Sequence, residues 1–157
     1  MRLLVAGPLA LALLVPATAD AAKPKICRVA SIHQTLANFG YDAPTKYIDK
    51  VECSDITDDG KVDALFSVAS GGTAGDTHYG VISGSSGSLL QYDEGYKIGI
   101  DAVSSTRFDV QQPNYGKHDA NCCPTSWSFT SYNWTGSVFI AGKTRTYKKP
   151  KKRFYIN

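Results

Sequence analysis

The feature that most constrains this fold is one continuous stretch, residues 53–75, with the sequence CSDITDDGKVDALFSVASGGTAG. An acidic turn and a glycine-rich turn enclose residues 64–69 (ALFSVA), which would be largely apolar on both faces of a strand. A strand that is apolar on both faces is usually covered on both sides. We therefore expect this strand at the centre of a sheet, between two turns of defined conformation.

The acidic turn has the residue spacing of a calcium-binding loop. Asp55 and Asp59 would take its first and fifth positions, and Gly60 would allow the sharp bend. Phe66 stands where such a loop usually carries its glutamate. One hypothesis is a weak Ca²⁺ site, and the other is a metal-free turn in which the two aspartates accept backbone N–H bonds. The candidate Ca²⁺ ligands are Asp55, Thr57, Asp59, Lys61 and Asp63.

The N-terminus has the parts of a secretory signal peptide. Arg2 precedes an apolar run at 3–15, and small residues suitable for cleavage follow. The run is too short for a membrane span. We expect residues 1–21 to be a signal peptide, residues 22–147 a single globular domain, and residues 148–157 a basic tail. The mature protein would then be secreted or otherwise extracytoplasmic.

Four cysteines in an exported chain predict two disulfides. Cys122 and Cys123 are adjacent, and a bond between them would strain the peptide that joins them. We therefore expect Cys27 and Cys53 each to pair with one member of the adjacent pair, which would draw a late loop onto the early strands. The alternative is zinc ligation by the adjacent cysteines and His118, which an oxidising compartment disfavours.

One helix precedes a series of strands. Ser31 and Gln34 have capping-box spacing, apolar residues recur at helical spacing, and Gly40 would end the helix. Alternating runs then predict strands, of which the clearest lie at 47–53, 78–82, 89–92, 104–110 and 125–134. The expected fold class is α+β: a twisted, mostly antiparallel sheet of six to eight strands with one short N-terminal helix, stapled by disulfides.

The irregular segment 111–124 (QQPNYGKHDANCCP) is long for a loop inside a compact domain, which indicates a function or a cross-link. Its candidate binding residues are Tyr115, His118 and Asp119.

The hairpin that follows carries aromatic residues on both faces. Trp127 and Phe129 would share one face of the strand, while Tyr132 and Trp134 would share the other. Either a bulge shifts the register or one aromatic pair is exposed, and an exposed pair would favour a contact surface that includes Trp134.

The C-terminal tail is strongly basic and would attract polyanions at low salt. On an exported chain we expect an anionic envelope polymer or a protein partner rather than intracellular nucleic acid. The alternative is a solvated tail that only keeps the domain soluble. The candidate binding residues of the tail are Lys148, Lys149, Lys151, Lys152 and Arg153.

The order of these motifs resembles the LppP/LprE lipoprotein family of actinobacteria. The resemblance covers roughly residues 50–140 and rests on three segments: DITDDGKVDALF, SGGTAG and DANCCPTSWSFTSYNW. Asn121-Cys122-Cys123-Pro124 is its most specific part. The resemblance implies an exported protein of the cell envelope and supplies no catalytic residue.

The sequence favours a non-enzymatic binding or interaction protein of the cell envelope or exterior, because no nucleophile, base and oxyanion donor stand together in it. The alternative is a hydrolase of envelope or extracellular polymers. Its carboxylates would be Asp93 and Glu94, or its acid–base pair His118 and Asp119. Apart from the candidate Ca²⁺ site, no cofactor is expected.

Overall fold

The computed structural model describes residues 23–151 and Phe154. The predicted signal peptide at 1–21, Lys152 and Arg153 lie outside the described residues. Two short 3₁₀ turns (Lys25–Cys27 and Thr45–Tyr47) flank the helix α1 (Val29–Asn38). The strands that follow are β1 (Ile48–Ser54), β2 (Asp63–Ala69), β3 (Asp76–Ile82), β4 (Leu89–Glu94), β5 (Gly99–Ser104), β6 (Arg107–Asn114), β7 (Ser126–Trp134), β8 (Phe139–Ala141) and β9 (Arg145–Tyr147).

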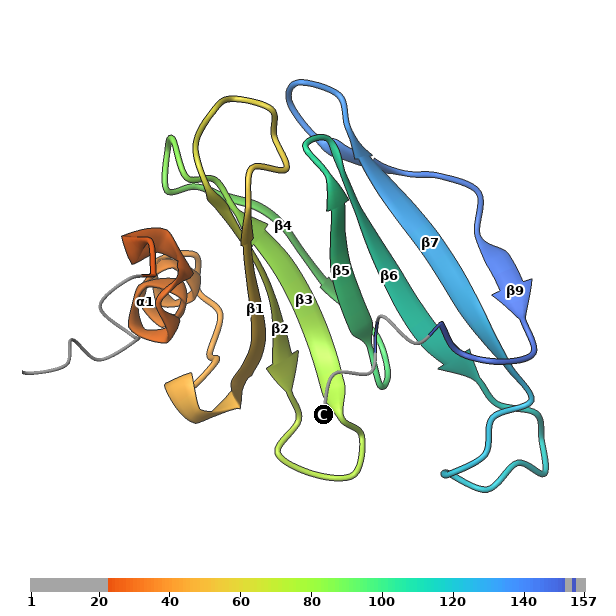
Figure 1. The fold of residues 1–157 in the computed structure, drawn as a ribbon. Helices are drawn as coiled ribbons and strands as arrows, with labels where there is room; N and C mark the ends of the chain where they lie inside the picture. The colour runs from red at the N-terminus through yellow and green to blue at the C-terminus, as the bar shows by residue number, and fades with distance from the viewer. Residues whose placement is uncertain (1–22, 152–153, 155–157) are drawn as a thin grey trace, which may run out of the picture.

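These strands form two antiparallel sheets rather than one (Figure 1). The first sheet has the order β1-β2-β3-β4, and the second has the order β5-β6-β7-β8 with β9 also paired to β7. The predicted α+β class, with mostly antiparallel strands and one N-terminal helix, is confirmed. The described residues form nine strands, slightly more than the six to eight predicted, and two of them, β8 and β9, are short strands that pair with β7.

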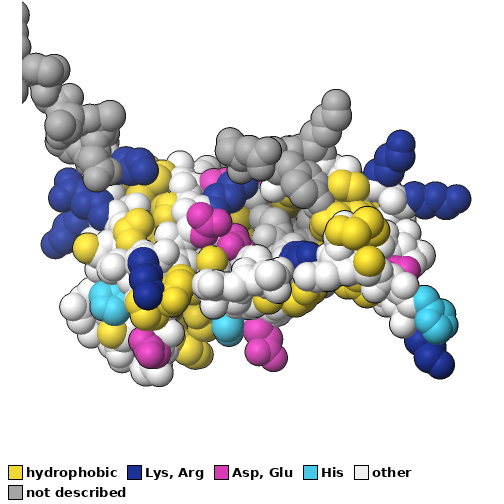
Figure 2. Space-filling view, turned by 90° about the horizontal axis from the view of Figure 1, so that it is seen from below, with side chains coloured by type: hydrophobic (Ala, Val, Ile, Leu, Met, Phe, Trp, Pro, Cys, Tyr) yellow, Lys and Arg dark blue, Asp and Glu magenta, His cyan; other side chains and the backbone are white. Residues whose placement is uncertain are grey.

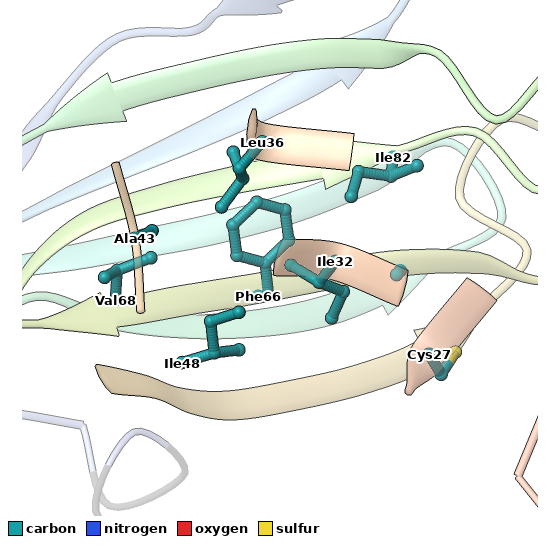
Figure 3. Packing of buried hydrophobic residues seen from close by; sticks show 9 residues of the cluster. Cys27, Ile32, Leu36, Ala43, Ile48, Phe66, Val68 and Ile82 are labelled. Atoms are coloured by element: carbon teal, nitrogen blue, oxygen red, sulfur yellow. The ribbon is translucent and has the colours of Figure 1, made fainter. Parts of the chain in front are cut away.

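One core lies between α1 and the first sheet (Figure 3). Ile32 and Leu36 of α1 face Phe66 and Val68 of β2, and all four are buried. Burial of each such side chain is worth about 1.5–3 kcal/mol, so this contact fixes the helix on the sheet. As predicted, β2 is a central strand that is buried on both faces.

A second core lies between the two sheets. Leu65 and Tyr79 of the first sheet pack with Phe108 and Val110 of the second. The hydroxyl oxygens of Tyr79 and Tyr132 lie 2.7 Å apart, which links the sheets by a hydrogen bond. Burial and this bond raise the pKa of Tyr79, so its hydroxyl stays protonated at neutral pH.

The helix ends as predicted but begins differently. Gly40 has φ +83°, a conformation that glycine adopts without steric cost, and the Tyr41 N–H donates to the Leu36 carbonyl. The predicted capping box is wrong, because α1 begins at Val29 and so includes Ser31. Arg28 occupies the N-cap without a side-chain bond.

Two predicted boundaries in the second sheet are also wrong. The run 104–110 is interrupted by a turn, since Ser104 of β5 pairs with Arg107 of β6. β6 then continues to Asn114, so the irregular segment begins at 115 rather than 111. The predicted hairpin of β3 and β4 around residues 84–87 is confirmed.

The predicted disulfide pairing is wrong. Cys27 pairs with Cys53 across a Cα–Cα distance of 6.0 Å, and Cys122 pairs with Cys123. Docking of α1 on the first sheet brings Cys27 next to β1, whereas the loop with the adjacent cysteines lies at the far end of the second sheet (Figure 1). The early cysteines therefore cannot reach that loop.

Hydrogen bonds, not a cross-link to the early strands, hold the late loop in place. Tyr96 donates to the Asn121 side chain at 2.6 Å, and Lys97 and Tyr115 both donate to the Asn121 carbonyl, at 2.6 and 2.8 Å. The loop is thus attached to the connection between β4 and β5.

Candidate functional site

The acidic turn is organised around Asp63, whose side chain is fully buried at the start of β2. One carboxylate oxygen accepts from the Ile56 N–H, the Thr57 N–H and the Thr57 hydroxyl at 2.9–3.0 Å. The other accepts from the Gly84 N–H at 2.8 Å. Asp63 therefore joins the acidic turn to the turn between β3 and β4.

Two further aspartates of the turn also accept backbone N–H bonds. Asp55 accepts from the N–H groups of Asp59 and Gly60, and Asp59 accepts from the N–H of Lys61 at 2.9 Å. Within the described residues, no group of three or more His, Cys, Asp or Glu side chains is arranged to hold a metal ion. The Ca²⁺ hypothesis itself stays a prediction.

The acidic turn also forms one wall of a cavity of about 390 Å³, which we call the loop pocket. Its other walls are the turn between β3 and β4 and the turn after β7. Hydrogen bonds from the Ser85 hydroxyl and the Lys61 N–H lower the pKa of Asp59, so its carboxylate is ionised at neutral pH. Besides Gly136, the loop pocket is lined by Thr57, Asp59, Ser83, Ser85, Ser86, Leu90, Trp134 and Ser137.

Trp134, a predicted binding residue, is half-buried in this pocket. Its ring packs against Phe139, with centroids 4.8 Å apart. The pairing of β6 with β7 continues without a register shift, so the bulge, one of the two alternatives, is not present in this pairing. Neither aromatic pair is fully exposed: Tyr132 packs against the core between the sheets, and Phe129 is buried on the opposite face.

A second cavity, the basic pocket, has a volume of about 360 Å³ on the outer face of the second sheet. Four cationic side chains line it with one buried carboxylate, Asp109, whose Oδ1 lies 3.7 Å from the Arg107 Nε. Ser131 and Asn133 add polar groups. The cations come from β6, β9 and the flanking segments, and are Arg107, Lys143, Arg145 and Lys151.

Among the tail lysines that the structure describes, Lys151 is the one that lines this pocket. Its N–H donates to the Gln111 side chain at 2.8 Å, and its ammonium lies 3.7 Å from the centroid of Phe129. Phe154 continues the tail over the same sheet and packs on Phe129 at 5.5 Å. Lys148 and Lys149 are exposed. The described part of the tail therefore lies along the second sheet.

The late loop is internally bonded. One oxygen of Asp119 accepts from the Gly116 N–H, the Thr125 N–H and the Thr125 hydroxyl at 2.7–2.8 Å, and these bonds lower the pKa of Asp119. His118 is exposed, and among the described residues no hydrogen bond joins it to Asp119. The Tyr115 hydroxyl donates its hydrogen bond to the Asn121 carbonyl.

The other predicted carboxylates lie elsewhere. Asp93 and Glu94 are exposed at the end of β4, where Asp93 accepts from the Gln91 side chain. The structure therefore does not bring the four candidate hydrolase residues together.

A third cavity, the acidic cleft, has a volume of about 540 Å³ between the starts of β1, β3 and β5. Burial and the neighbouring Asp49 raise the pKa of Asp76, while a bond from the Ser67 hydroxyl opposes that rise. Figure 2 shows acidic side chains near the middle of the molecule's lower face, with many Lys and Arg side chains toward its ends. The carboxylates that line this cleft are Asp49, Glu52, Asp76 and Asp101.

Sequence reasoning missed most of the basic pocket and all of the acidic cleft. The signal for the basic pocket was present in β6, where Arg107, Asp109 and Gln111 alternate with the apolar Phe108 and Val110. That alternation predicts a polar outer face. The acidic cleft carries no such signal, since its carboxylates come from three strands that are distant in sequence.

Comparisons with known proteins do not assign the chain to a family. No family model, no curated protein and no solved structure matches the chain. The resemblance to the LppP/LprE family therefore stays a prediction. Among the described residues, no helix is long and apolar enough to cross a membrane.

Proposed function

We propose that this chain is an exported, non-enzymatic binding protein of the cell envelope or exterior, related to the LppP/LprE family, and that it binds an anionic polymer through the basic pocket. The observation that carries the proposal is the set of four cationic side chains, Arg107, Lys143, Arg145 and Lys151, around one cavity.

The charge balance of the pocket supports an anionic ligand. Of the described residues, Asp109 alone brings a carboxylate to the pocket, and it lies against Arg107, while Lys143 and Arg145 are exposed at the pocket surface. Ser131 and Asn133 add hydrogen-bonding groups beside them. A phosphate, sulfate or carboxylate group of a polymer fits this combination of charge and hydrogen bonding.

The contacts of Lys151 indicate that the basic pocket is ordered before a ligand binds. Its backbone bond to Gln111 and its place over the rings of Phe129 and Tyr147 hold the ammonium before a ligand arrives. A site that is already ordered loses less conformational entropy on binding.

Retention on immobilised polyphosphate and on immobilised heparin tests the proposal. The double variant Lys143→Gln/Arg145→Gln should elute at a lower salt concentration than the wild type. The slope of the logarithm of its binding constant against the logarithm of the salt concentration should be smaller by about 1 for each lost contact. The control Lys46→Gln/Lys61→Gln removes the same charge from exposed sites outside the pocket. Equal shifts for the two double variants, or no retention of the wild type, would refute the assignment of the site.

A hydrolase stays the second candidate because of the acidic cleft. A carboxyl group that is protonated at a higher pH than usual, next to a second carboxylate, suits general acid–base catalysis. Asp76 and Asp49 would then replace the four residues that sequence analysis favoured. Release of soluble fragments from isolated cell walls by the wild type, and its loss in Asp76→Asn, would favour this function; no release by the wild type would exclude it.

A further inference from the structure

The loop pocket carries an inference that does not depend on the proposed function. Its three turns are far apart in sequence but lie at the same end of the two sheets, at the top of Figure 1. The acidic turn connects β1 to β2, the second turn connects β3 to β4, and the third connects β7 to β8. The cavity of about 390 Å³ falls within the usual size range of small-ligand sites.

Buried contacts make this pocket rigid before any ligand binds. Asp63 bonds to both the acidic turn and Gly84, as described above. A Cβ built at Gly84 would lie 2.0 Å from the Val62 carbonyl oxygen, which shows how closely the two turns approach. Thr57 and Ser83 in the pocket wall are buried as well. These contacts fix two of the three walls, and the third turn is closed by a bond from the Thr135 N–H to the Val138 carbonyl at 3.0 Å.

The side chains of the lining that a ligand could reach are of three kinds. One is a half-buried aromatic ring, Trp134, and another is a set of hydroxyls from Ser85, Ser86 and Ser137. Asp59 adds a carboxylate that accepts hydrogen bonds, and no lysine or arginine among the described residues lines the pocket.

These groups select the chemistry of a ligand. An aromatic ring offers a flat apolar contact, and hydroxyl and carboxylate groups exchange hydrogen bonds with a polyol. A sugar ring has both an apolar C–H face and peripheral hydroxyls. An anionic ligand would be repelled by the Asp59 carboxylate, because the one cation that acts on this carboxylate among the described residues, Lys61, lies outside the lining.

We propose that the loop pocket is a binding site for a neutral saccharide, with the Trp134 indole against a sugar ring and the Asp59 carboxylate accepting from a sugar hydroxyl. The ligand class differs from that of the basic pocket, so the two sites are distinguished by their response to salt. Saccharide binding should persist in high salt, whereas polyanion binding should not.

Titration of the purified protein with neutral hexasaccharides of glucose, mannose and N-acetylglucosamine, in high salt, tests the proposal. Tryptophan fluorescence and calorimetry would report binding. We expect at least one of the three to bind, and Trp134→Ala to weaken that binding about tenfold. The matched control is Trp127→Ala, because Trp127 lies on the opposite face of β7, beside Tyr147 of β9, and outside the pocket.

Two further variants keep the test independent of any effect of Trp134→Ala on folding. Asp59→Asn and Ser85→Ala alter exposed side chains of the lining, and each should weaken binding several-fold. Each also weakens or removes a hydrogen bond at the pocket, from Lys61 to Asp59 or between Ser83 and Ser85, so we expect a small fall in melting temperature. The basic-pocket variant Lys143→Gln/Arg145→Gln should bind the saccharide as the wild type does. The proposal is overturned if none of the three saccharides binds, if both lining variants bind like the wild type, or if Trp127→Ala costs as much affinity as Trp134→Ala.

Discussion

Replacing Asp63 with alanine should cost more stability than any other single change in the acidic turn. The carboxylate is fully buried and accepts four hydrogen bonds, three from the acidic turn and one from Gly84. Truncation removes all four acceptor contacts at once. The N–H groups of Ile56 and Thr57, which are themselves buried residues, would be left without their partner.

The magnitude follows from the number of donors that lose a partner. Leaving a buried donor unsatisfied costs about 1–3 kcal/mol, and hydrogen bonds to a charged group lie at the upper end of the usual range. The unsatisfied N–H groups of Ile56 and Thr57 together cost about 4 kcal/mol, provided that water satisfies the Gly84 N–H and the Thr57 hydroxyl. A domain has about 5–15 kcal/mol of stability in total, so this loss would be a large part of it.

Urea unfolding measures the effect. With a slope of about 2 kcal/mol per molar urea, the midpoint of Asp63→Ala should fall by about 2 M. The control is Asp55→Ala, whose carboxylate accepts two exposed backbone bonds and should cost about 1 kcal/mol or less. A loss below about 1 kcal/mol for Asp63→Ala, or equal losses for the two variants, would show that Asp63 does not join the turns.

Four other predictions concern stability. Removing the disulfide in Cys27→Ser/Cys53→Ser, which closes a sequence separation of 26 residues, should lower the free energy of unfolding by about 3.5 kcal/mol in a urea titration; an unchanged midpoint would contradict this. Gly84→Ala should cost about 1–3 kcal/mol in the same assay, because its methyl group would clash with the backbone of Val62, and a neutral effect would refute the close approach. The pKa of Asp76 is raised above 3.8 in the folded state, so protonation of Asp76 stabilises the fold fully below pH 3.8, and this stabilisation is lost as the pH rises through the raised pKa. Asparagine resembles the protonated side chain, so Asp76→Asn should unfold at a higher urea concentration than the wild type at pH 7. The two midpoints should converge in acid, and equal midpoints at pH 7 would contradict the raised pKa. A chelator should leave the urea midpoint unchanged, because the carboxylates of the acidic turn already accept bonds from the chain, and a fall in the midpoint would instead favour the Ca²⁺ hypothesis.

Local patterns were enough to predict the elements of this fold. The apolar run in β2 indicated a central strand because both of its faces are apolar, and the helix end was marked by Gly40. The helix start was harder, since Ser31 has capping-box spacing but lies inside α1. The side chain of Gln34 bonds to Asn38 one turn later instead. Spacing alone does not say which turn of a helix comes first.

Long-range pairing could not be predicted in the same way. The disulfide prediction assumed that strain would exclude a bond between Cys122 and Cys123, and it had no information on where α1 docks. Packing of Ile32 and Leu36 on the first sheet places Cys27 beside Cys53, and that placement decides the pairing. The division into two sheets has the same origin, because it depends on which faces pack rather than on where strands begin.

The acidic turn shows why residue spacing alone does not identify a calcium loop. A calcium loop and a self-bonded turn both need several oxygens that converge on one point, so both favour the same residue types. Donors of the chain that already occupy those oxygens favour the self-bonded turn, although a carboxylate has about four lone-pair sites and can accept an N–H bond beside a cation. In this fold the approach of Gly84 to Asp63 supplies a donor from a second turn, and the Ile56 and Thr57 N–H groups supply donors from the first. The Asp63 carboxylate joins the two turns that form walls of the loop pocket, and Asp59 lies exposed in the lining, where a ligand can reach it.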